Sequence, residues 1–250
     1  PVLVLDHLSG FEEGIDWATG DLNCRCSGRI QRNGKSEGVV RHCTFTGNLR
    51  DALSRVVDLA SDTDRIRGVD APSICVDGLV VEGGEGGGFK NPCDVALMVL
   101  LPLIRSKVDV PIIAAGGMVC GRTMAAAFAL GAEGIQMGTR MVSAAESPVH
   151  HNWKDAIISA KETDTVFLNR FSSPGLRALR TERSERLERQ DNVSLSEMAN
   201  AMDLYFGGDM NAAIALSGQV AGRIESVEPV AKIIEDTIAE FAATVARLAG

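Results

Sequence analysis

Glycine pairs follow two short apolar runs of the chain, and their spacing suits the binding of a phosphate group. Gly116 and Gly117 follow the run at 110–115, and Gly138 and Thr139 follow the run at 134–137. Because glycine has no Cβ, backbone N–H groups at such turns can approach a ligand closely. A helix that begins just after the turn adds its partial positive charge. We therefore expect these residues to hold the phosphate of a bound ligand.

A third glycine-rich stretch, at 83–88, has five glycines in six residues and follows an apolar run at 76–82. So many glycines disfavour any regular element. The stretch is either a flexible loop or a segment whose backbone lies against a flat ligand. The preceding run is typical of a buried parallel strand, whose following loop often lines a site, so we favour the ligand-binding interpretation.

The elements that must position these turns alternate between short strands and helices. Strand, glycine turn, helix, strand and glycine turn follow one another over 110–140. This order is typical of the last units of a parallel βα barrel, whose final loops often bind phosphate. The fold class that we predict is α/β, a TIM-like (β/α)8 barrel. We expect one barrel domain over 1–250, with 141–215 as a helical insertion.

Further elements follow from periodicity and composition. Strands are expected at 1–5, 21–26, 39–45 and 165–168, a loop at 61–71, and helices at 48–59, 94–106, 120–130, 149–161, 175–190, 195–206 and 229–248. The last helix has an apolar face that we interpret as packing, formed by Ile233, Ile234, Ile238, Phe241, Val245 and Leu248. Six or seven strand candidates fall short of the eight that a closed barrel needs. The barrel is therefore predicted to be incomplete at its N-terminal strands, or completed by another chain.

Bulk composition excludes several classes of protein. The chain has 250 residues and a net charge of −8, with no long basic run, which argues against binding to nucleic acid or anionic membranes. The longest apolar run, 95–104, contains Pro102 and is too short to span a bilayer. The six cysteines lack zinc-site spacing, so we expect reduced cysteines, no metal and a cytoplasmic location.

Several motifs, in order, resemble the nitronate monooxygenase family, formerly called 2-nitropropane dioxygenases. They are VVEGGEGGGF at 80–89, PIIAAGG at 111–117, GIQMGTR at 134–140, ESPVH at 146–150, WK at 153–154 and GQVAG at 218–222. Each motif is weak alone, but their order is specific, and the resemblance runs from about 39 to 230. The family is close to the flavin-dependent enoyl-thioester reductases. The resemblance implies a barrel with bound FMN and an oxidoreductase activity on a substrate with an activated C–H bond.

The resemblance also implies roles for single residues. Glu82 sits near the flavin ring, where the nitronate branch commonly has Gln and the reductase branch often has Glu. An anion there would be costly beside a reduced flavin unless Glu82 is protonated or paired. The cofactor-binding set implied in this way comprises Glu82, Gly87, Gly116, Gly117, Gln136, Met137, Gly138 and Thr139.

This sequence departs from the family where the glycine loop usually ends in His, because it has Phe89 there. A phenyl ring cannot take a proton, so we expect His150 or His151 to substitute as the catalytic base. Phe89 is expected to line the substrate site. Lys90 could meet an anionic substrate group, although a solvated surface lysine is the simpler interpretation.

Four functions stay open from the sequence. The first is an FMN-dependent oxidoreductase, and the second is a flavin-dependent reductase or dehydrogenase of an unsaturated acyl thioester. The third is a flavin-free barrel enzyme that binds a phosphorylated substrate. The fourth is a non-catalytic subunit that completes a partner's barrel. A small-molecule substrate, and either a homo-oligomer or a partner chain, are expected with the first two.

Overall fold

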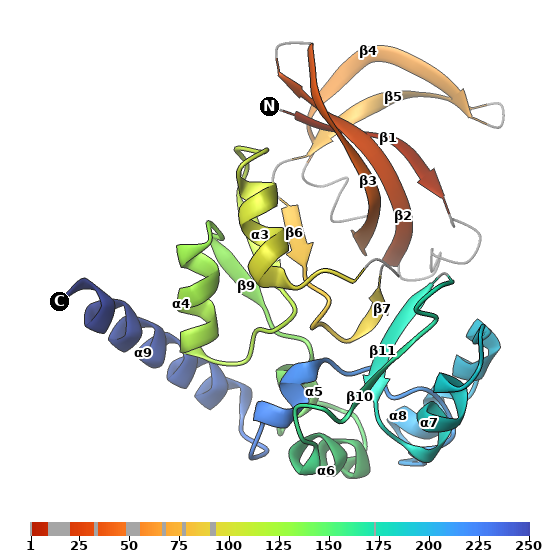
Figure 1. Cartoon of the computed structure of the whole chain (residues 1–250), viewed down its shortest axis with the longest axis vertical. Helices are drawn as coiled ribbons and strands as arrows, with labels where there is room; N and C mark the ends of the chain where they lie inside the picture. The colour runs from red at the N-terminus through yellow and green to blue at the C-terminus, as the bar shows by residue number, and fades with distance from the viewer. Residues whose placement is uncertain are drawn as a thin grey trace. The chain divides into compact units, whose positions relative to one another are not determined.

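A computed structural model describes residues 2–9, 21–32, 35–48, 56–66, 69–76, 79–90, 94–172 and 174–250. They form two compact units, Pro1–Leu79 with Ser106–Pro111, and Val80–Arg105 with Ile112–Gly250 (Figure 1). The chain passes from the first unit to the second between Leu79 and Val80 and returns to the first over Ser106–Pro111. The single domain expected over 1–250 stays a prediction. None of the helices in the described ranges has the length and hydrophobicity that crossing a bilayer requires.

The first unit consists of antiparallel strands. β1 (Val2–Ser9), β2 (Asp21–Arg32) and β3 (Lys35–Asn48) form a sheet in the order β1-β2-β3. β4 (Val56–Ile66) and β5 (Val69–Val76) form a separate antiparallel pair. The three strands predicted at 1–5, 21–26 and 39–45 are confirmed as parts of longer strands.

Two predictions are wrong in the β4–β5 pair. The helix predicted at 48–59 is strand over 56–59, and the loop predicted at 61–71 lies largely in β4 and β5; residues 49–55 lie outside the described residues. Val56 is paired with Val76, and Leu59 with Ile74, across the hairpin. Cross-strand pairs of this kind stabilise a strand whatever its local apolar spacing suggests.

The second unit contains a parallel sheet in the order β6-β8-β9 (Figure 1). Its strands are β6 (Leu79–Glu82), β8 (Ile112–Ala115) and β9 (Gly134–Gln136). β8 and β9 are parallel. Leu79 N donates to Pro111 O at 2.9 Å and Gly83 N to Ala115 O at 3.0 Å, so β6 and β8 run in the same direction.

Helices α3 (Leu97–Arg105) and α4 (Gly121–Ala129) follow β6 and β8 in the chain. The strand, turn and helix order predicted over 110–140 is therefore confirmed. The described residues form a mixed α/β unit in which this parallel sheet has three strands rather than a closed ring.

A second sheet of this unit is antiparallel, in the order β10-β11-β7. It contains β7 (Gly88–Lys90), β10 (Thr165–Leu168) and β11 (Gly175–Leu179). The helix predicted at 175–190 is wrong over its first part, because β11 pairs with strands on both sides and is wholly buried. The helical part is α7 (Glu182–Glu188), which Thr181 caps by accepting from Ser184 N at 3.2 Å. Region 141–215 is thus mixed rather than purely helical.

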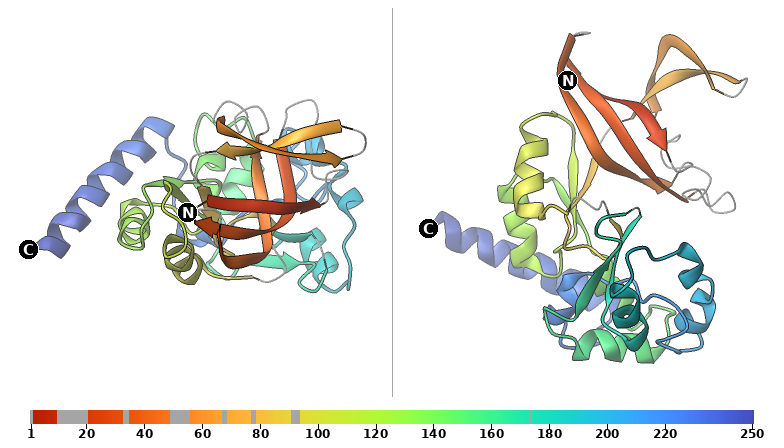
Figure 2. Two further views of the ribbon diagram at one scale, coloured as in Figure 1. Left: turned by 90° about the horizontal axis from the view of Figure 1, so that it is seen from above. Right: turned by 45° about the vertical axis from the view of Figure 1, so that its right-hand side comes forward.

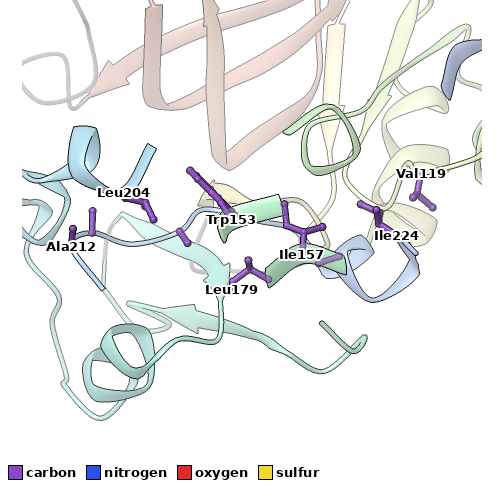
Figure 3. Close-up of a cluster of buried hydrophobic side chains, with 10 residues drawn as sticks. Val119, Trp153, Ile157, Leu179, Leu204, Ala212 and Ile224 are labelled. Carbon is purple, nitrogen blue, oxygen red and sulfur yellow. The ribbon is translucent and has the colours of Figure 1, made fainter. Parts of the chain in front are cut away.

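The remaining helices follow the parallel sheet in the chain, and several of them contribute to a buried apolar cluster. They are α5 (Thr139–Val142), α6 (His151–Ser159), η1 (Leu195–Met198), α8 (Ala201–Tyr205), η2 (Gln219–Arg223) and α9 (Val230–Ala249). Trp153 and Ile157 of α6 pack with Leu179 of β11 and Leu204 of α8 in this cluster (Figure 3). The cluster therefore connects the elements that follow the parallel sheet.

Helix α9 packs on α4 along part of its length (Figures 1 and 2). Ile233 and Thr237 are buried, and the Phe241 and Phe128 rings lie 5.1 Å apart. However, four large apolar residues of the face interpreted as packing are exposed: Ile234, Ile238, Val245 and Leu248. That interpretation is wrong for these four side chains.

Candidate functional site

Two glycine turns pack backbone to backbone at the carboxyl edge of the parallel sheet. Gly83 N donates to Ala115 O at 3.0 Å, which joins the loop after β6 to the end of β8. A Cβ on Gly116 would lie 2.9 Å from Gly83 O and 3.0 Å from Gly86 N. Gly116 also has a φ of +79°, which side chains disfavour. Glycine at 116 is therefore required by the close approach of the two turns.

The segment at Gly218 closes the same loop from another side. Gln219 N donates to Glu85 O at 2.9 Å, and Gly218 N donates to the Thr139 Oγ1 at 2.9 Å. A Cβ on Gly87 would lie 2.6 Å from Gly218 N. The structure thus brings Gly87, Gly116 and Thr139 close to one another, with the GQ motif between them, and their contact with a cofactor stays a prediction.

The turn glycine Gly138 has open space beside it, whereas Gly117 is in ordinary van der Waals contact with Glu85. A Cβ on Gly117, whose φ is +76°, would meet nothing closer than Glu85 Cβ at 3.9 Å. A Cβ on Gly138 would meet nothing within 4 Å. β8 and β9 are adjacent, with Ala115 opposite Gln136, so the two glycines follow neighbouring strand ends. Exposed backbone at two neighbouring strand ends fits the phosphate of a ligand such as FMN.

The N-terminus of α4 is already capped by a carboxylate of α9. The Glu240 Oε2 accepts from Arg122 N at 3.3 Å, and its Oε1 lies 2.8 Å from the Arg122 Nε. Burial alone would raise the pKa of Glu240, but hydrogen bonds from Cys120 and backbone amides, with the Arg122 charge, bring it below its ordinary value. The helix charge expected to help at Gly117 is therefore already engaged by Glu240, and exposed backbone remains for a phosphate.

Glu82 and Lys90, which flank the glycine loop, form an ion pair. Lys90 is 7% exposed, so the interpretation as a solvated surface lysine is wrong. Burial lowers the pKa of Lys90 below its ordinary value, although the Glu82 carboxylate opposes the shift. The condition set for Glu82, that it be protonated or paired, is met by this pair.

Three charged residues that the sequence pattern did not single out hold the glycine loop in place. The buried Arg177 donates through Nε to Gly84 O at 2.7 Å, and its NH2 group lies 3.3 Å from the Asp94 Oδ2. Leu97 N, at the start of α3, donates to both Glu85 carboxylate oxygens at 2.9 and 3.0 Å. Burial lowers the pKa of Arg177, while Asp94 opposes the shift. In the sequence, this role was indicated by a charged residue, Arg177, inside the apolar run GLRAL at 175–179.

Phe89 and Lys90 are neighbours on β7, so their side chains leave the strand on opposite faces. Phe89 is paired with Leu176 and packs, half-buried, against a buried apolar cluster. That cluster comprises Val166, Leu168, Leu176, Ala178, Leu187, Val193 and Ile214. A substrate-lining role for Phe89 stays a prediction beside this packing role.

His150 caps helix α6 and contacts the α8 region. Its Nδ1 accepts from Asn152 N at 3.2 Å, and its backbone N donates to Tyr205 O at 2.6 Å. The His151 ring lies 4.0 Å from the His150 ring, centroid to centroid, and is exposed. These contacts give His150 a structural role, and the catalytic role expected of either histidine stays a prediction.

Comparison with known proteins gives two family matches. A model described as nitronate monooxygenase matches residues 50–240. A model described as the PmbA/TldA metallopeptidase C-terminal domain matches residues 1–83. The second match ends one residue after β6, close to the boundary between the two compact units.

Individual relatives resemble part of the chain. The chain is 39% identical over 117 residues to an indene-4-carboxyl-CoA dehydrogenase of Rhodococcus jostii (strain RHA1), covering 47% of this chain and 33% of that protein. It is 35% identical over 145 residues to a probable nitronate monooxygenase of Staphylococcus aureus (strain MSSA476), covering 55% and 39%. The structure of FabK from Thermotoga maritima superposes with a TM-score of 0.66 at 37% identity, covering 70% of this chain and 57% of FabK. The chain therefore spans little more than half of FabK and less of the curated relatives.

Proposed function

Because the chain belongs to the nitronate monooxygenase family, we propose that its second unit is the phosphate-holding part of an FMN-dependent oxidoreductase with a TIM-like barrel fold. The observation that carries this proposal is the uncrowded backbone at two neighbouring strand ends, where Gly138 has open space and Gly117 has only van der Waals contact with Glu85. The order of β6, α3, β8, α4 and β9 supports successive βα units of one barrel.

The proposed roles follow the contacts of the loops. The backbone at Gly117 and Gly138 holds the phosphate, with Gln136, Met137 and Thr139 beside it. Gly87 and Glu82 would lie near the flavin ring of the bound FMN. Bound FMN would accept or donate the electrons of the reaction, while the protein supplies orientation and charge balance.

The glycine loop meets such a ligand as a preformed surface. Glu85 fixes the loop to α3, and Arg177 fixes it through Gly84. Lys90 balances the charge of Glu82. A loop held in this way has less conformational freedom to lose on binding, which favours affinity.

The proposed substrate is a small molecule with an activated C–H bond, such as one beside a nitro group. An acyl thioester is the second candidate, since the Rhodococcus relative is described as a carboxyl-CoA dehydrogenase. Apolar Phe89 near the loop and Glu82 in place of Gln both agree with a thioester. His150 or His151 is the proposed base, and its test is the loss of turnover in the corresponding Ala variants.

The test is a titration of the purified chain with FMN, followed by quenching of flavin fluorescence. Gly117→Asp should weaken binding about 100-fold, or about 3 kcal/mol, because it places bulk and negative charge against the phosphate. Gly38→Asp is the matched control, because Gly38 lies in the first unit and a Cβ there would meet nothing within 4 Å. It should leave the dissociation constant unchanged.

Equal affinity of the Gly117→Asp variant and the wild type would contradict this placement of the phosphate. Binding of inorganic phosphate without binding of FMN would instead favour the flavin-free enzyme. Mixing the FMN-loaded protein with ethyl nitronate or a short acyl-CoA separates the two substrate classes by which of them bleaches the flavin absorbance.

A further inference from the structure

The two side chains of strand β7 lie on opposite faces of the strand. Phe89 is paired with Leu176 and packs against a buried apolar cluster. Lys90 is the next residue, so its side chain leaves the strand on the other face, where it meets the Glu82 carboxylate. The side chain that β7 directs toward the glycine loop is therefore the charged Lys90, and not Phe89.

The ion pair of Glu82 and Lys90 lies directly beside Gly86, inside the glycine loop at 83–88. A Cβ on Gly86 would collide with the Glu82 Oε1 and would lie 2.6 Å from the Lys90 Nζ. Glu82 is the last residue of β6 and Lys90 the last residue of β7. The pair therefore fixes the two ends of the loop to each other, and residue 86 has to be small for the pair to form.

The other charged side chains near Lys90 have partners of their own. Arg177 and Asp94 form an ion pair, and Arg177 also donates to Gly84 O at 2.7 Å. Burial lowers the pKa of Lys90, which the Glu82 charge opposes, and Arg177 lowers this pKa further while Asp94 raises it. Lys90 is thus the cation that compensates Glu82.

The two members of the pair differ in their access to a ligand. The Lys90 Nζ is shielded from solvent, so it touches no ligand directly. The Glu82 side chain, in contrast, is 37% exposed. Its Oε1 engages Lys90, which leaves Oε2 for another hydrogen-bond donor. Because an ionised carboxylate only accepts hydrogen bonds, the matching group on a ligand is a donor such as an N–H of a flavin ring.

We infer that Lys90 is a positioning residue for the flavin ring: it holds the Glu82 carboxylate beside Gly86, where that carboxylate accepts a hydrogen bond from an N–H of the ring. This inference rests on the proposed function and concerns the ring of FMN, not its phosphate. Lys90 acts through Glu82, because its own ammonium group is shielded from the ligand.

The test is a fluorescence titration of the full chain with FMN and with riboflavin, which has the same ring but no phosphate. Lys90→Met should weaken both ligands about tenfold, because Glu82 loses the group that fixes it. Lys90→Arg keeps the positive charge and should recover both affinities to within about threefold. Lys232→Met is the matched control, because its pair with Asp236 is largely exposed, and it should change either affinity less than about twofold.

A double-mutant cycle separates positioning of Glu82 from general packing. If Lys90 acts through Glu82, Lys90→Met should weaken flavin binding less than about twofold once Glu82→Gln is present. An equal loss in both backgrounds would overturn the inference.

Gly86→Ala is a second probe, which also serves if Lys90→Met does not fold. Its methyl group would displace the ends of both side chains and keep their charges. Riboflavin binding should weaken severalfold, and an unchanged affinity would contradict the inference.

The two flavins also separate this inference from the proposed function. A wild-type chain that binds neither FMN nor riboflavin would contradict the proposed function. A wild-type chain that binds both, with Lys90→Met equally tight, would contradict this inference alone. Gly117→Asp should weaken FMN and leave riboflavin unchanged, because it acts at the phosphate end of the ligand.

Discussion

The glycines of the site belong to two environments, one crowded and one open. Cβ atoms on Gly87 and Gly218 would meet backbone atoms of the facing segment at 2.5–2.9 Å. At Gly117 the nearest contact would be 3.9 Å away, and at Gly138 there would be none within 4 Å. The first group lets three backbone segments pack against one another. The second group leaves backbone available to a ligand, so glycines of the same motifs serve two different purposes.

The largest loss of stability is expected for a substitution at Gly87, which belongs to the crowded group. In Gly87→Ala the new methyl group would lie 2.5 Å from the Ser217 carbonyl carbon and 2.6 Å from Gly218 N. Both are backbone atoms that cannot rotate away, so we expect a loss of about 3 kcal/mol in the free energy of unfolding. The measurement is urea unfolding followed by Trp153 fluorescence in a Trp17→Phe background, so that the signal reports the second unit. A loss under about 0.5 kcal/mol would show that the crowding is easily relieved.

A smaller effect is expected at the ion pair that braces the crowded loop. Glu82→Ala leaves Lys90 buried without its carboxylate, which should cost about 1–3 kcal/mol in the same assay. Glu133→Ala is the control, because its pair with Arg105 is 3.9 Å long and largely exposed, and it should cost under about 0.5 kcal/mol. Equal losses in the two variants would remove the distinction between the buried and the exposed pair.

The Glu82–Lys90 pair also makes the free energy of unfolding depend on pH, and the direction of the Lys90 pKa shift sets the sign of that dependence. Burial lowers the pKa of Lys90 in the folded chain. Between this lowered pKa and the ordinary lysine pKa, the unfolded chain binds more protons, so stability should rise with pH across that interval. Lys90→Met should abolish this part of the rise. Urea midpoints of both proteins across the alkaline range provide the measurement.

The smallest effect on stability is expected at the open turn. Gly138 has a φ of −87° and free space around it, so Gly138→Ala should change the free energy of unfolding by less than about 0.5 kcal/mol. Its affinity for FMN should nevertheless fall severalfold, because the methyl group enters the space proposed for the phosphate. A stability loss as large as that of Gly87→Ala would place Gly138 in the crowded group.

Local patterns in the sequence predicted the parallel part of the fold. β8, α4 and β9 follow one another within 112–136, and each has its own apolar run and glycine boundary. The rule that loops after parallel strands share one edge predicted that Gly116 and Thr139 lie near each other, whereas the place of Gly87 was implied by the family resemblance. These features depend on short segments, so sequence alone could specify them.

Features that depend on contacts between segments far apart in the chain could not be predicted from local patterns. β11 was predicted as helix because its strand conformation depends on pairing with β7, which lies far earlier in the chain, as in the pairing of Arg177 with Gly88. The burial of Lys90 also depends on that pairing and on Glu82. The crowded and open glycines are likewise distinguished only by the segments that pack on them, of which Ser217 and Gly218 lie far away in the chain.

The cap on α4 has a consequence for biosynthesis. Glu240 contacts the backbone of Arg122, which it follows by 118 residues in the chain. During translation the first turn of α4 is therefore made long before its carboxylate exists. The contact between Glu240 and the Arg122 backbone can form only after the C-terminal helix has been made, so this stabilisation of the α4 N-terminus is a late event in synthesis.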